Sequence, residues 1–374
     1  MSDRNRRNAD PPPARLAELP ELVVSWYREN RRRLPWREEV SPYRTLLSEI
    51  MLQQTRVEAV KPYFERFLAA FPDVSSLADA DDELLCKKWE GLGYYSRARN
   101  LKKCAREIVD RFGGVIPSTV PELLSLPGIG PYTAGAIAAF AYGRPVAAVD
   151  GNVLRVTARI TAETGDVLSP AVKNKLTALV SSLVPADAAS DFGQGLIELG
   201  ALICLPNRPP KCELCPVSTL CLGYSEGIAE RLPVRIKKTE RKLDRRTVLV
   251  IRSGTRTLLR KRPARGLLAG LWEFPNYSGG FTEKEALDAV KALGFEPLRI
   301  RPLDPAKHLF THIEWQMTGY LVLVAEPDFP LPEGCVMPET DDLLSRYAIP
   351  SAFSAYVRCL STPLSQINQK EKRK

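Results

Sequence analysis

The chain has 374 residues, of which 44% are hydrophobic, enough for two domains with apolar cores. A run of about eighteen apolar residues, which a membrane-spanning helix needs, is absent from the sequence, and residues 1–15 carry no apolar stretch typical of a secretory signal. The net charge of +9 comes from residues 231–246 (+6) and 361–374 (+3), so the remainder sums to zero. This distribution gives weak support for a polyanionic partner and fits a solvated linker and tail equally well.

The first part of the chain has the apolar spacing of helices. Ser41 and Pro42 predict the start of a helix in which Tyr43, Leu46 and Ile50 fall on one face. Further helices are expected at 56–70, 82–90, 97–112, 119–125, 132–142, 152–162, 170–183 and 190–204. Strand signals are nearly absent before residue 226. We therefore predict a disordered tail over residues 1–17 and an all-α domain over residues 18–226.

The period of the apolar residues changes after a basic connector at residues 227–246. Strands are expected at 247–252, 257–262, 271–275 and 320–326. One helix is expected at 282–294, with Thr282 and Glu285 spaced as a capping box. The chain is therefore expected to be multi-domain, with a second, α+β domain over residues 247–360 and a disordered basic tail over 361–374.

The stretch LPGIGPYTAG, residues 126–135, places Gly128 and Gly130 at a turn before a helix of small residues. Glycine permits close approach of the backbone to a ligand, and the free amides of a helix N-terminus bind phosphate. An ordinary glycine–proline loop between two helices explains the stretch as well, so both interpretations stay open.

Four of the eight cysteines lie within eighteen residues, in the pattern Cys204-x7-Cys212-x2-Cys215-x5-Cys221. Four thiolates suit zinc or a 4Fe–4S cluster. Zinc ribbons usually carry two C-x2-C pairs and this segment has one, which favours iron–sulfur over zinc. Free buried thiols are the plain alternative.

Two carboxylates stand in positions that suit acid–base chemistry. Asp150 follows an apolar run and precedes a helix, so it either caps that helix, as Asn152 could, or stays ionised near the helix N-terminus. Glu49 lies at the edge of an apolar stripe within SEIMLQQT. It is either a surface residue or a carboxyl whose pKa is raised by apolar surroundings, and which can then act as an acid.

Several motifs together resemble the helix–hairpin–helix DNA glycosylases, and among them the adenine DNA glycosylase (MutY) family. They are LPGIGPYTAGA, AVDGN, SEIMLQQT, GLGYYSRARN and the four cysteines, in one order, and the resemblance covers about residues 20–360. It implies two helical subdomains with the active site in a cleft between them, and a 4Fe–4S cluster on the four cysteines. Seven residues separate Cys204 from Cys212, where the family usually has six.

The resemblance also implies an activity, the removal of adenine mispaired with 8-oxoguanine or guanine in double-stranded DNA. Glu49 matches the acid that protonates adenine, and Asp150 matches the carboxylate that faces the sugar. This pair fits the chemistry, because adenine leaves as a neutral base only after protonation, while the sugar becomes an oxocarbenium ion. Tyr132 is implied to line the pocket, and Asn152 to belong to the catalytic group.

The remaining implied contacts are with DNA. The adenine must leave the base stack, and Gln54 and Tyr94 are the candidates to fill the gap, although Tyr94 could equally be a packed loop residue. Gly128 and Gly130 are implied to grip a phosphate. A monofunctional glycosylase of this kind is expected to leave an intact abasic site.

The second domain resembles a Nudix fold. Its helix lacks the glutamates of the Nudix pattern REUxEExGU, in which U is an aliphatic residue. We therefore expect a module that reads 8-oxoguanine and does not hydrolyse nucleotides. In KHLFTHIEW, Phe310, Thr311 and His312 match a Phe-Ser-His loop of the family, with threonine in place of serine. His308 and His312 also have the spacing of metal ligands, but the glutamate of HExxH is missing, so a DNA-touching loop at a strand end is favoured.

Two other functions remain open at this stage. An endonuclease III-like enzyme would excise damaged pyrimidines and nick the strand, but that family has lysine where Tyr132 stands. A non-catalytic iron–sulfur DNA-binding protein would be expected to lack Glu49 or Asp150, and both are present. We expect a monomer that acts in the cytoplasm on nucleoid DNA, with no membrane partner.

Overall fold

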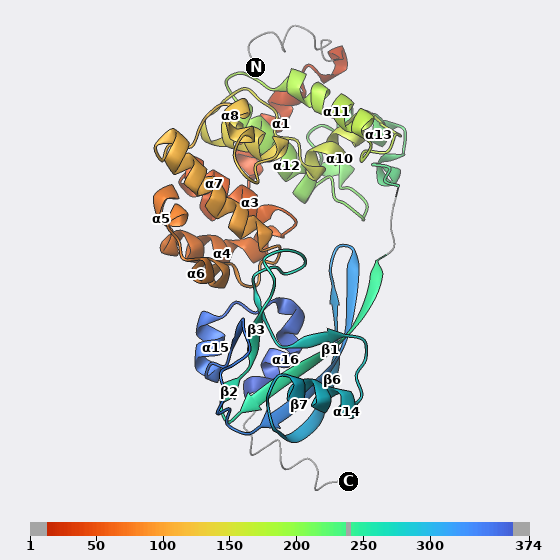
Figure 1. Cartoon of the computed structure of the whole chain (residues 1–374). Coiled ribbons are helices and arrows are strands. Elements are labelled where there is room, and N and C mark those ends of the chain that lie inside the picture. The colour runs from red at the N-terminus through yellow and green to blue at the C-terminus, as the bar shows by residue number, and fades with distance from the viewer. Residues whose placement is uncertain (1–12, 237–240, 362–374) are drawn as a thin grey trace. The chain divides into compact units, whose positions relative to one another are not determined.

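The computed structural model describes residues 13–236 and 241–361, and Figure 1 shows its elements. The chain divides into two compact units, one of residues 1–80 with 99–237 and one of residues 81–98 with 238–374. The segments 1–12, 237–240 and 362–374, on which parts of the predicted tails and connector fall, lie outside the described residues. Within the described ranges, no helix is long and apolar enough to cross a membrane.

The first unit is helical, as predicted. Its helices are α1 (Leu19–Asn30), α2 (Pro35–Glu38), α3 (Pro42–Leu52), α4 (Val57–Ala70), α5 (Val74–Ala78), α7 (Ser96–Phe112, whose first residues belong to the other unit), α8 (Val120–Leu124), α9 (Pro131–Ala136), α10 (Gly151–Ile160), α11 (Pro170–Leu183), α12 (Ala189–Leu202) and α13 (Leu222–Ser225). Between residues 13 and 236 the described chain contains no strand. A core of Val23, Val153, Phe192 and Leu199 joins α1, α10 and α12.

The predicted N-terminal tail is too long by a few residues. A 3-10 turn at Ala14–Leu16 precedes α1, and Leu16 is fully buried in the helical core. The Arg15 guanidinium donates to the carbonyl of Leu220 at 2.8 Å. The buried leucine and this hydrogen bond hold the turn on the helical core, and the proline-rich composition that suggested a tail ends just before it.

The turn between α8 and α9 uses both of its glycines. Gly128 has a φ of +79°, and a Cβ there would lie 2.8 Å from the Cβ of Asn100, so this position needs glycine. Gly130 caps α9 without a side-chain hydrogen bond, and Pro131 opens the helix. A π-helical turn, Ile137–Ala141, continues α9. At Gly135 a Cβ would meet the Ala147 carbonyl at 2.3 Å, because α9 passes close to the segment before α10.

The second unit is an α+β fold, as predicted. Its elements are α6 (Asp82–Trp89), β1 (Lys242–Ser253), β2 (Arg256–Thr257), β3 (Leu259–Lys261), β4 (Trp272–Glu273), β5 (Asn276–Ser278), α14 (Glu283–Ala292), β6 (Pro297–Leu309), β7 (Ile313–Val324), β8 (Cys335–Val336), α15 (Thr340–Arg346) and α16 (Ser354–Val357). One sheet has the order β2-β1-β7-β6 with β5 also paired to β1, and a second has the order β4-β3-β8.

Strand β1 separates two apolar cores by its alternating side chains. Val248 and Val250 face a core with α15 and α16, whereas Leu249 and Ile251 face a core with α14. This strand begins at Lys242, inside the segment predicted as a connector, because it pairs in parallel with β7 from Ile313 onward. The capping box on α14 is present as predicted, between Thr282 and Glu285.

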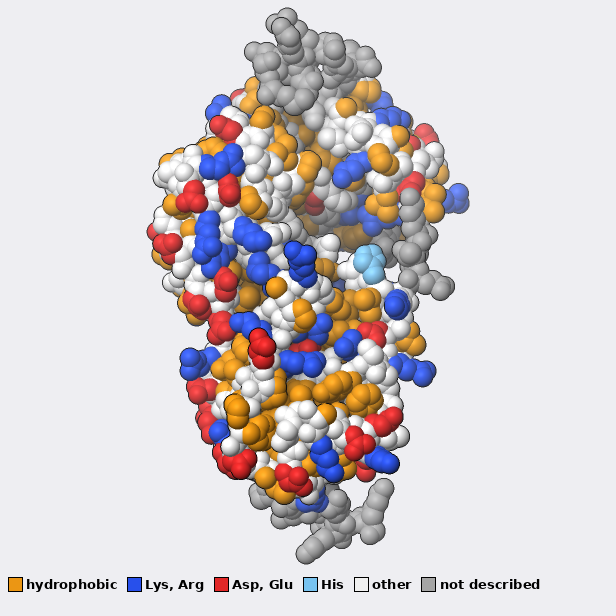
Figure 2. All heavy atoms as spheres, in the orientation of Figure 1, with side chains coloured by type: hydrophobic (Ala, Val, Ile, Leu, Met, Phe, Trp, Pro, Cys, Tyr) orange, Lys and Arg blue, Asp and Glu red, His pale blue; other side chains and the backbone are white. Residues whose placement is uncertain are grey.

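Strand β6 was not predicted, since its three prolines argue against a strand. The structure accommodates them because β6 pairs only with β7 and lies at the edge of its sheet, where an amide donor is dispensable. The β6–β7 hairpin places residues 310–312 at its tip, as expected for a loop at a strand end. A histidine of this chain, whose two histidines both lie here, is visible at the surface in Figure 2.

Candidate active site

A small pocket of about 70 Å³ in the helical unit collects charged groups of both signs. Helix α3 carries Glu49 into it, and this helix begins as predicted, with the Ser41 hydroxyl accepting from the Arg44 amide at 3.2 Å. The pocket is also lined by Arg32, Trp36, Arg37, Tyr132, Gln194 and Glu198. The lining of the pocket therefore comes from α2, α3, α4, α9 and α12, from the π-helical turn and from the segment that follows α1.

Glu49 is buried, with 7% of its surface exposed, so the surface interpretation of this residue is wrong. The Tyr132 hydroxyl donates to Glu49 Oε2 at 2.7 Å. Burial raises the pKa of Glu49 to about 7, the Tyr132 hydrogen bond opposes this rise, and the charge of Asp150 adds to it. The carboxyl is thus held near the midpoint of its titration at neutral pH.

Glu198 shares the pocket in the opposite charge state. It is fully buried, and Arg32 Nε and Arg37 Nη2 lie 2.6 and 3.2 Å from its two oxygens. Burial raises the pKa of this carboxyl, but the hydrogen bonds and charges of the two arginines outweigh it and lower the pKa overall. The pocket therefore holds one ionised carboxylate and one that can be protonated.

This cluster of Glu198 with Arg32 and Arg37 was not predicted from the sequence. Glu198 lies between the apolar residues Ile197 and Leu199 of α12, and its arginine partners come from more than 160 positions earlier in the chain. Gln194, one turn before Glu198, accepts from Arg37 Nε at 2.9 Å. The available signal was a single glutamate between apolar residues in DFGQGLIELG, but nothing in the sequence identifies its partners.

Asp150 caps α10 and remains partly exposed. One oxygen accepts from the amides of Asn152 and Val153, each at 2.8 Å, and the other accepts from the Asn152 side chain at 2.7 Å. Burial raises the pKa of Asp150, while these three hydrogen bonds and the charge of Arg155 act to lower it. Asp150 is therefore the N-cap of α10, as one of its two interpretations predicted, and the hydrogen bonds of the cap orient its carboxylate.

Arg155 connects this cap to the first cysteine. Its guanidinium donates to Asn152 Oδ1 at 2.9 Å, to the Gly200 carbonyl at 2.8 Å and to the Cys204 carbonyl at 2.9 Å. Arg155 is buried, so these bonds are made in a low dielectric, where hydrogen bonds to a charge are strong. The position of Asp150 is thus linked to the cysteine segment through two side chains.

The four cysteines line one cavity together with apolar residues such as Val156, Leu199 and Val217. All four are free thiols, and Arg159 donates to Cys204 Sγ at 3.2 Å, which suits an anionic sulfur. In the described part of the chain, no three His, Cys, Asp or Glu side chains are arranged around one metal ion. A 4Fe–4S cluster takes one thiolate at each of four irons, so it does not require the sulfurs to converge on a single point.

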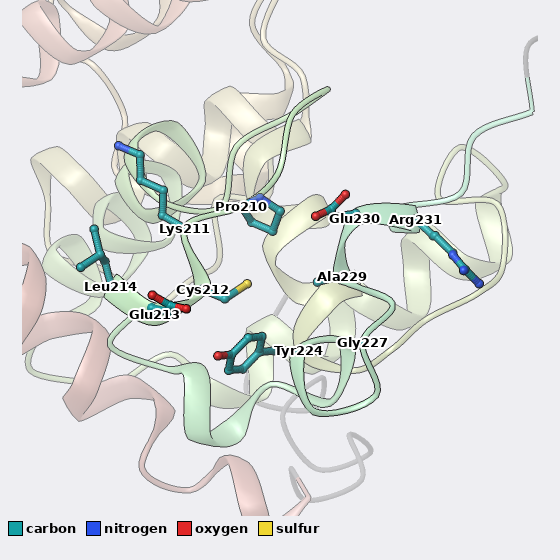
Figure 3. Close-up of a pocket in the computed structure, with 11 residues that line it drawn as sticks. Pro210, Lys211, Cys212, Glu213, Leu214, Tyr224, Gly227, Ala229, Glu230 and Arg231 are labelled. Atoms are coloured by element: carbon teal, nitrogen blue, oxygen red, sulfur yellow. The ribbon is translucent and has the colours of Figure 1, made fainter.

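A larger cavity of about 800 Å³ is also lined by Cys212. Figure 3 shows the Cys212 sulfur directed into it, with the Tyr224 ring and Glu230 also on its wall. Cys212 is thus the one of the four cysteines that lines both cavities.

Around α7, Figure 2 shows basic side chains gathered on the surface of the helical unit, a distribution that the net charge of the chain did not reveal.

The residues that are candidates to contact DNA come from both units. Gln54 in the helical unit and Tyr94 in the other unit are both exposed, and both adopt a left-handed backbone, with φ of +60° and +47°. Such a conformation is uncommon for residues other than glycine and is often found at functional sites. Thr311 and His312 are exposed at the β6–β7 tip, and Phe310 packs against Trp315 behind them.

Known proteins resemble both parts of this chain. Residues 47–182 match the family model of the HhH-GPD superfamily base excision DNA repair proteins, and residues 247–358 match that of the NUDIX domain. An adenine DNA glycosylase of Mus musculus is 36% identical over 371 residues, covering 83% of this chain and 72% of that protein. One of Buchnera aphidicola is 32% identical, covering 81% and 86%. The solved structure of a thermostable thymine-DNA glycosylase is 30% identical, with a TM-score of 0.51 over 57% of this chain and 97% of its own.

The raised pKa of Glu49 predicts a pH-dependent stability. The pKa of this carboxyl is about 7 in the folded chain, compared with an ordinary value of 4.5. The free energy of unfolding of the wild type therefore falls as the pH rises between these two values, because the buried carboxyl must ionise. Glu49→Gln cannot ionise. Its free energy of unfolding relative to wild type should therefore increase, by about 3 kcal/mol, from below pH 4.5 to above pH 7.

Chemical denaturation across this range measures the difference. Glu29→Gln, on the exposed end of α1, controls for the loss of one negative charge. A difference between Glu49→Gln and wild type that is the same at both ends of the range would contradict the assignment.

Proposed function

This chain belongs to the adenine DNA glycosylase family, and we propose that the buried pair of Glu49 and Tyr132 carries its chemistry. The enzyme is a DNA glycosylase that cleaves the N-glycosyl bond of adenine. The observation that supports this site is the 2.7 Å hydrogen bond between Tyr132 and a buried carboxyl whose pKa is raised to about 7. A general acid works best when its pKa lies near the working pH.

Glu49 acts as the proton donor to the leaving adenine. As an anion, adenine is a poor leaving group, so a ring nitrogen must gain a proton as the bond to the sugar breaks. The buried carboxyl supplies that proton, and the Tyr132 hydroxyl then stabilises the carboxylate that forms by donating to Oε2. Tyr132 is thereby a catalytic residue through its contact with the reacting carboxyl.

Asp150 stabilises the oxocarbenium ion that develops on the sugar, and a water molecule then adds to C1′ and loses a proton to give the abasic site. Its carboxylate is held by two amides of α10 and by the Asn152 side chain, so its orientation is fixed before DNA binds. Asn152 and Arg155 position this carboxylate through their own hydrogen bonds. One carboxyl that donates a proton and one that faces a cation form the arrangement of glycoside hydrolysis.

The Glu198 cluster offers a means of recognising the adenine. A glutamine side chain can make two hydrogen bonds to the edge of adenine, and Gln194 lines the pocket beside Glu49. Its amide oxygen is engaged by Arg37 and its nitrogen by Ser190, so its orientation is fixed. We propose that this face of the pocket selects adenine once the base has left the stack.

The enzyme acts on DNA, and we propose that its substrate is a mispaired duplex. Adenine opposite 8-oxoguanine or guanine is the mispair, Gln54 and Tyr94 fill the gap left by the base, and Phe310, Thr311 and His312 meet the opposite strand. The uncapped N-terminus of α9 after Gly128 and Gly130 leaves amides that suit a phosphate. We expect a monomer acting on nucleoid DNA in the cytoplasm.

The Nudix-like domain serves as a reader without hydrolase activity. In α14, Glu285 is occupied by the capping box, and alanine, valine and lysine stand where the Nudix pattern needs glutamates. The Mg²⁺ ligands of a Nudix hydrolase are therefore missing from this helix.

Cys204, Cys212, Cys215 and Cys221 are proposed to hold a 4Fe–4S cluster. The support is the donor set of four free thiols around one apolar cavity, with the Arg159 guanidinium beside Cys204. When bound, the cluster cross-links the segment 204–221. These residues then fix the carbonyl of Cys204, to which Arg155 donates.

Replacing either carboxylate should abolish excision. Glu49→Gln removes the proton donor and Asp150→Asn removes the negative charge, while each preserves side-chain volume. We expect single-turnover adenine release to fall by about 10²-fold or more in each variant. Duplexes with one A:8-oxoguanine or A:G mispair serve as substrates, and affinity for the same duplex should remain near that of wild type.

Glu29→Gln is the control with unchanged excision. Normal turnover by either carboxylate variant would refute the assignment of that residue.

The wild-type product should be an intact abasic site, since Tyr132 offers no amine for a Schiff base. Borohydride trapping of the wild-type protein on DNA would show the endonuclease III-like alternative instead.

The cluster predicts iron and acid-labile sulfide in the purified protein. We expect visible absorption from iron–sulfur charge transfer, and a loss of iron and of folded yield in Cys212→Ser. Cys359→Ser, in the other unit, should retain the iron content of wild type. One zinc with no iron in metal analysis would show that the four thiols form a zinc site.

A further inference from the structure

Residues 81–98 belong to the unit that contains the Nudix-like domain, and specific contacts hold them there. The Ile349 amide donates to Glu90 Oε1 at 2.9 Å, and Lys87 Nζ donates to the Tyr347 carbonyl at 3.2 Å. Lys87 also pairs with Glu90 Oε2 at 2.6 Å, and the pair is partly buried. Segment 81–98 is therefore anchored on residues 347–349 by a bonded pair of side chains.

The loop that follows α6 is held in one shape. The Gly93 carbonyl accepts from the Trp89 indole at 3.0 Å and from Arg97 Nη2 at 3.2 Å. The Arg97 guanidinium lies 5.5 Å from the centroid of the Tyr94 ring, an arrangement that restricts the ring. Tyr94 is thus presented on a fixed loop, and its side chain is exposed.

The loop of Thr311 is fixed as well. The Phe310 amide donates to the Ile313 carbonyl at 2.8 Å, and Arg241 Nε donates to the Phe310 carbonyl at 3.1 Å. The Lys242 amide donates to the His312 carbonyl at 2.9 Å. Both neighbours of Thr311 are therefore bonded to other parts of the unit, while its own side chain is exposed.

The hydroxyls of Tyr94 and Thr311 lie 3.1 Å apart and form a hydrogen bond. Guanine offers a lone pair at N7, whereas 8-oxoguanine carries a proton there, so a reader of this edge must present an acceptor and withhold a donor. A threonine hydroxyl has one proton and two lone pairs, and by itself it rotates to suit either base. A neighbour that takes the proton removes this ambiguity.

We propose that Tyr94 fixes the polarity of Thr311: the Thr311 hydroxyl donates its proton to Tyr94 Oη and keeps its lone pairs for the N7–H of 8-oxoguanine. This inference rests on the proposed function of Thr311 as a reader of the lesion. Guanine is disfavoured because its N7 lone pair faces the lone pairs of Thr311. Tyr94 then determines specificity by acting through a second side chain, in addition to filling the gap in the stack.

Tyr94→Phe tests the proposal, because it removes the hydroxyl and keeps the ring. The readout is the ratio of dissociation constants for A:G and A:8-oxoguanine duplexes in which a 2′-fluorine on the adenosine blocks hydrolysis. We expect the preference for 8-oxoguanine to fall about fivefold, the value of one neutral hydrogen bond. The main change should be tighter binding of the A:G duplex, since the freed hydroxyl can now donate to guanine N7.

The same substitution is then made in a Thr311→Val background, where valine keeps the shape and lacks the hydroxyl. Tyr94→Phe should have no further effect on the ratio there, and Tyr63→Phe, in the helical unit, should leave the ratio of the wild type unchanged. An equal loss from Tyr94→Phe in both backgrounds, or no loss in the wild type, would overturn the proposal. A Thr311→Val variant with undiminished preference would instead refute Thr311 as the reader.

Discussion

Burial of the Glu49 carboxyl against the Tyr132 hydroxyl constrains much of the helical unit. The pair requires α3 and α9 to approach closely, and α9 can approach the segment before α10 only because Gly135 has no side chain. The same approach brings Asp150, the cap of α10, within electrostatic reach of Glu49. The turn at Gly128 and Pro131, with its tyrosine one residue later, is thus part of the acid site as well as a candidate phosphate grip.

Two acidic groups of the same kind have opposite roles in one pocket because their neighbours differ. Glu49 has a hydroxyl donor and apolar surroundings, and its pKa is raised to about 7. Glu198 has two arginines, and its pKa is lowered although its side chain is fully buried. Burial alone raises the pKa of both, so the partners decide which carboxyl keeps its proton.

The elements and the main candidates were predictable from sequence where the signal is local. The cap at Ser41, the capping box at Thr282 and the helices of the first unit follow from spacing over a few residues. The bonds from Glu198 to Arg32 and from Tyr94 to Thr311 join residues more than 160 positions apart, and no local pattern specifies them. Strand β6 was not predicted because its three prolines argue against a strand. Only the structure shows that β6 lies at the edge of its sheet, where prolines are tolerated. The placement of α6 with the second unit likewise depends on contacts such as that of Glu90 with Ile349.

The proton on Glu49 is the central claim, and the pH dependence of single-turnover adenine excision tests it most directly. For the wild-type protein the rate should fall tenfold per pH unit above about 7, where the carboxyl ionises. In Tyr132→Phe this decline should begin at higher pH, because the hydroxyl that lowers the pKa of Glu49 is gone. A wild-type rate that is constant through this range, or a decline that Tyr132→Phe leaves in place, would contradict the account.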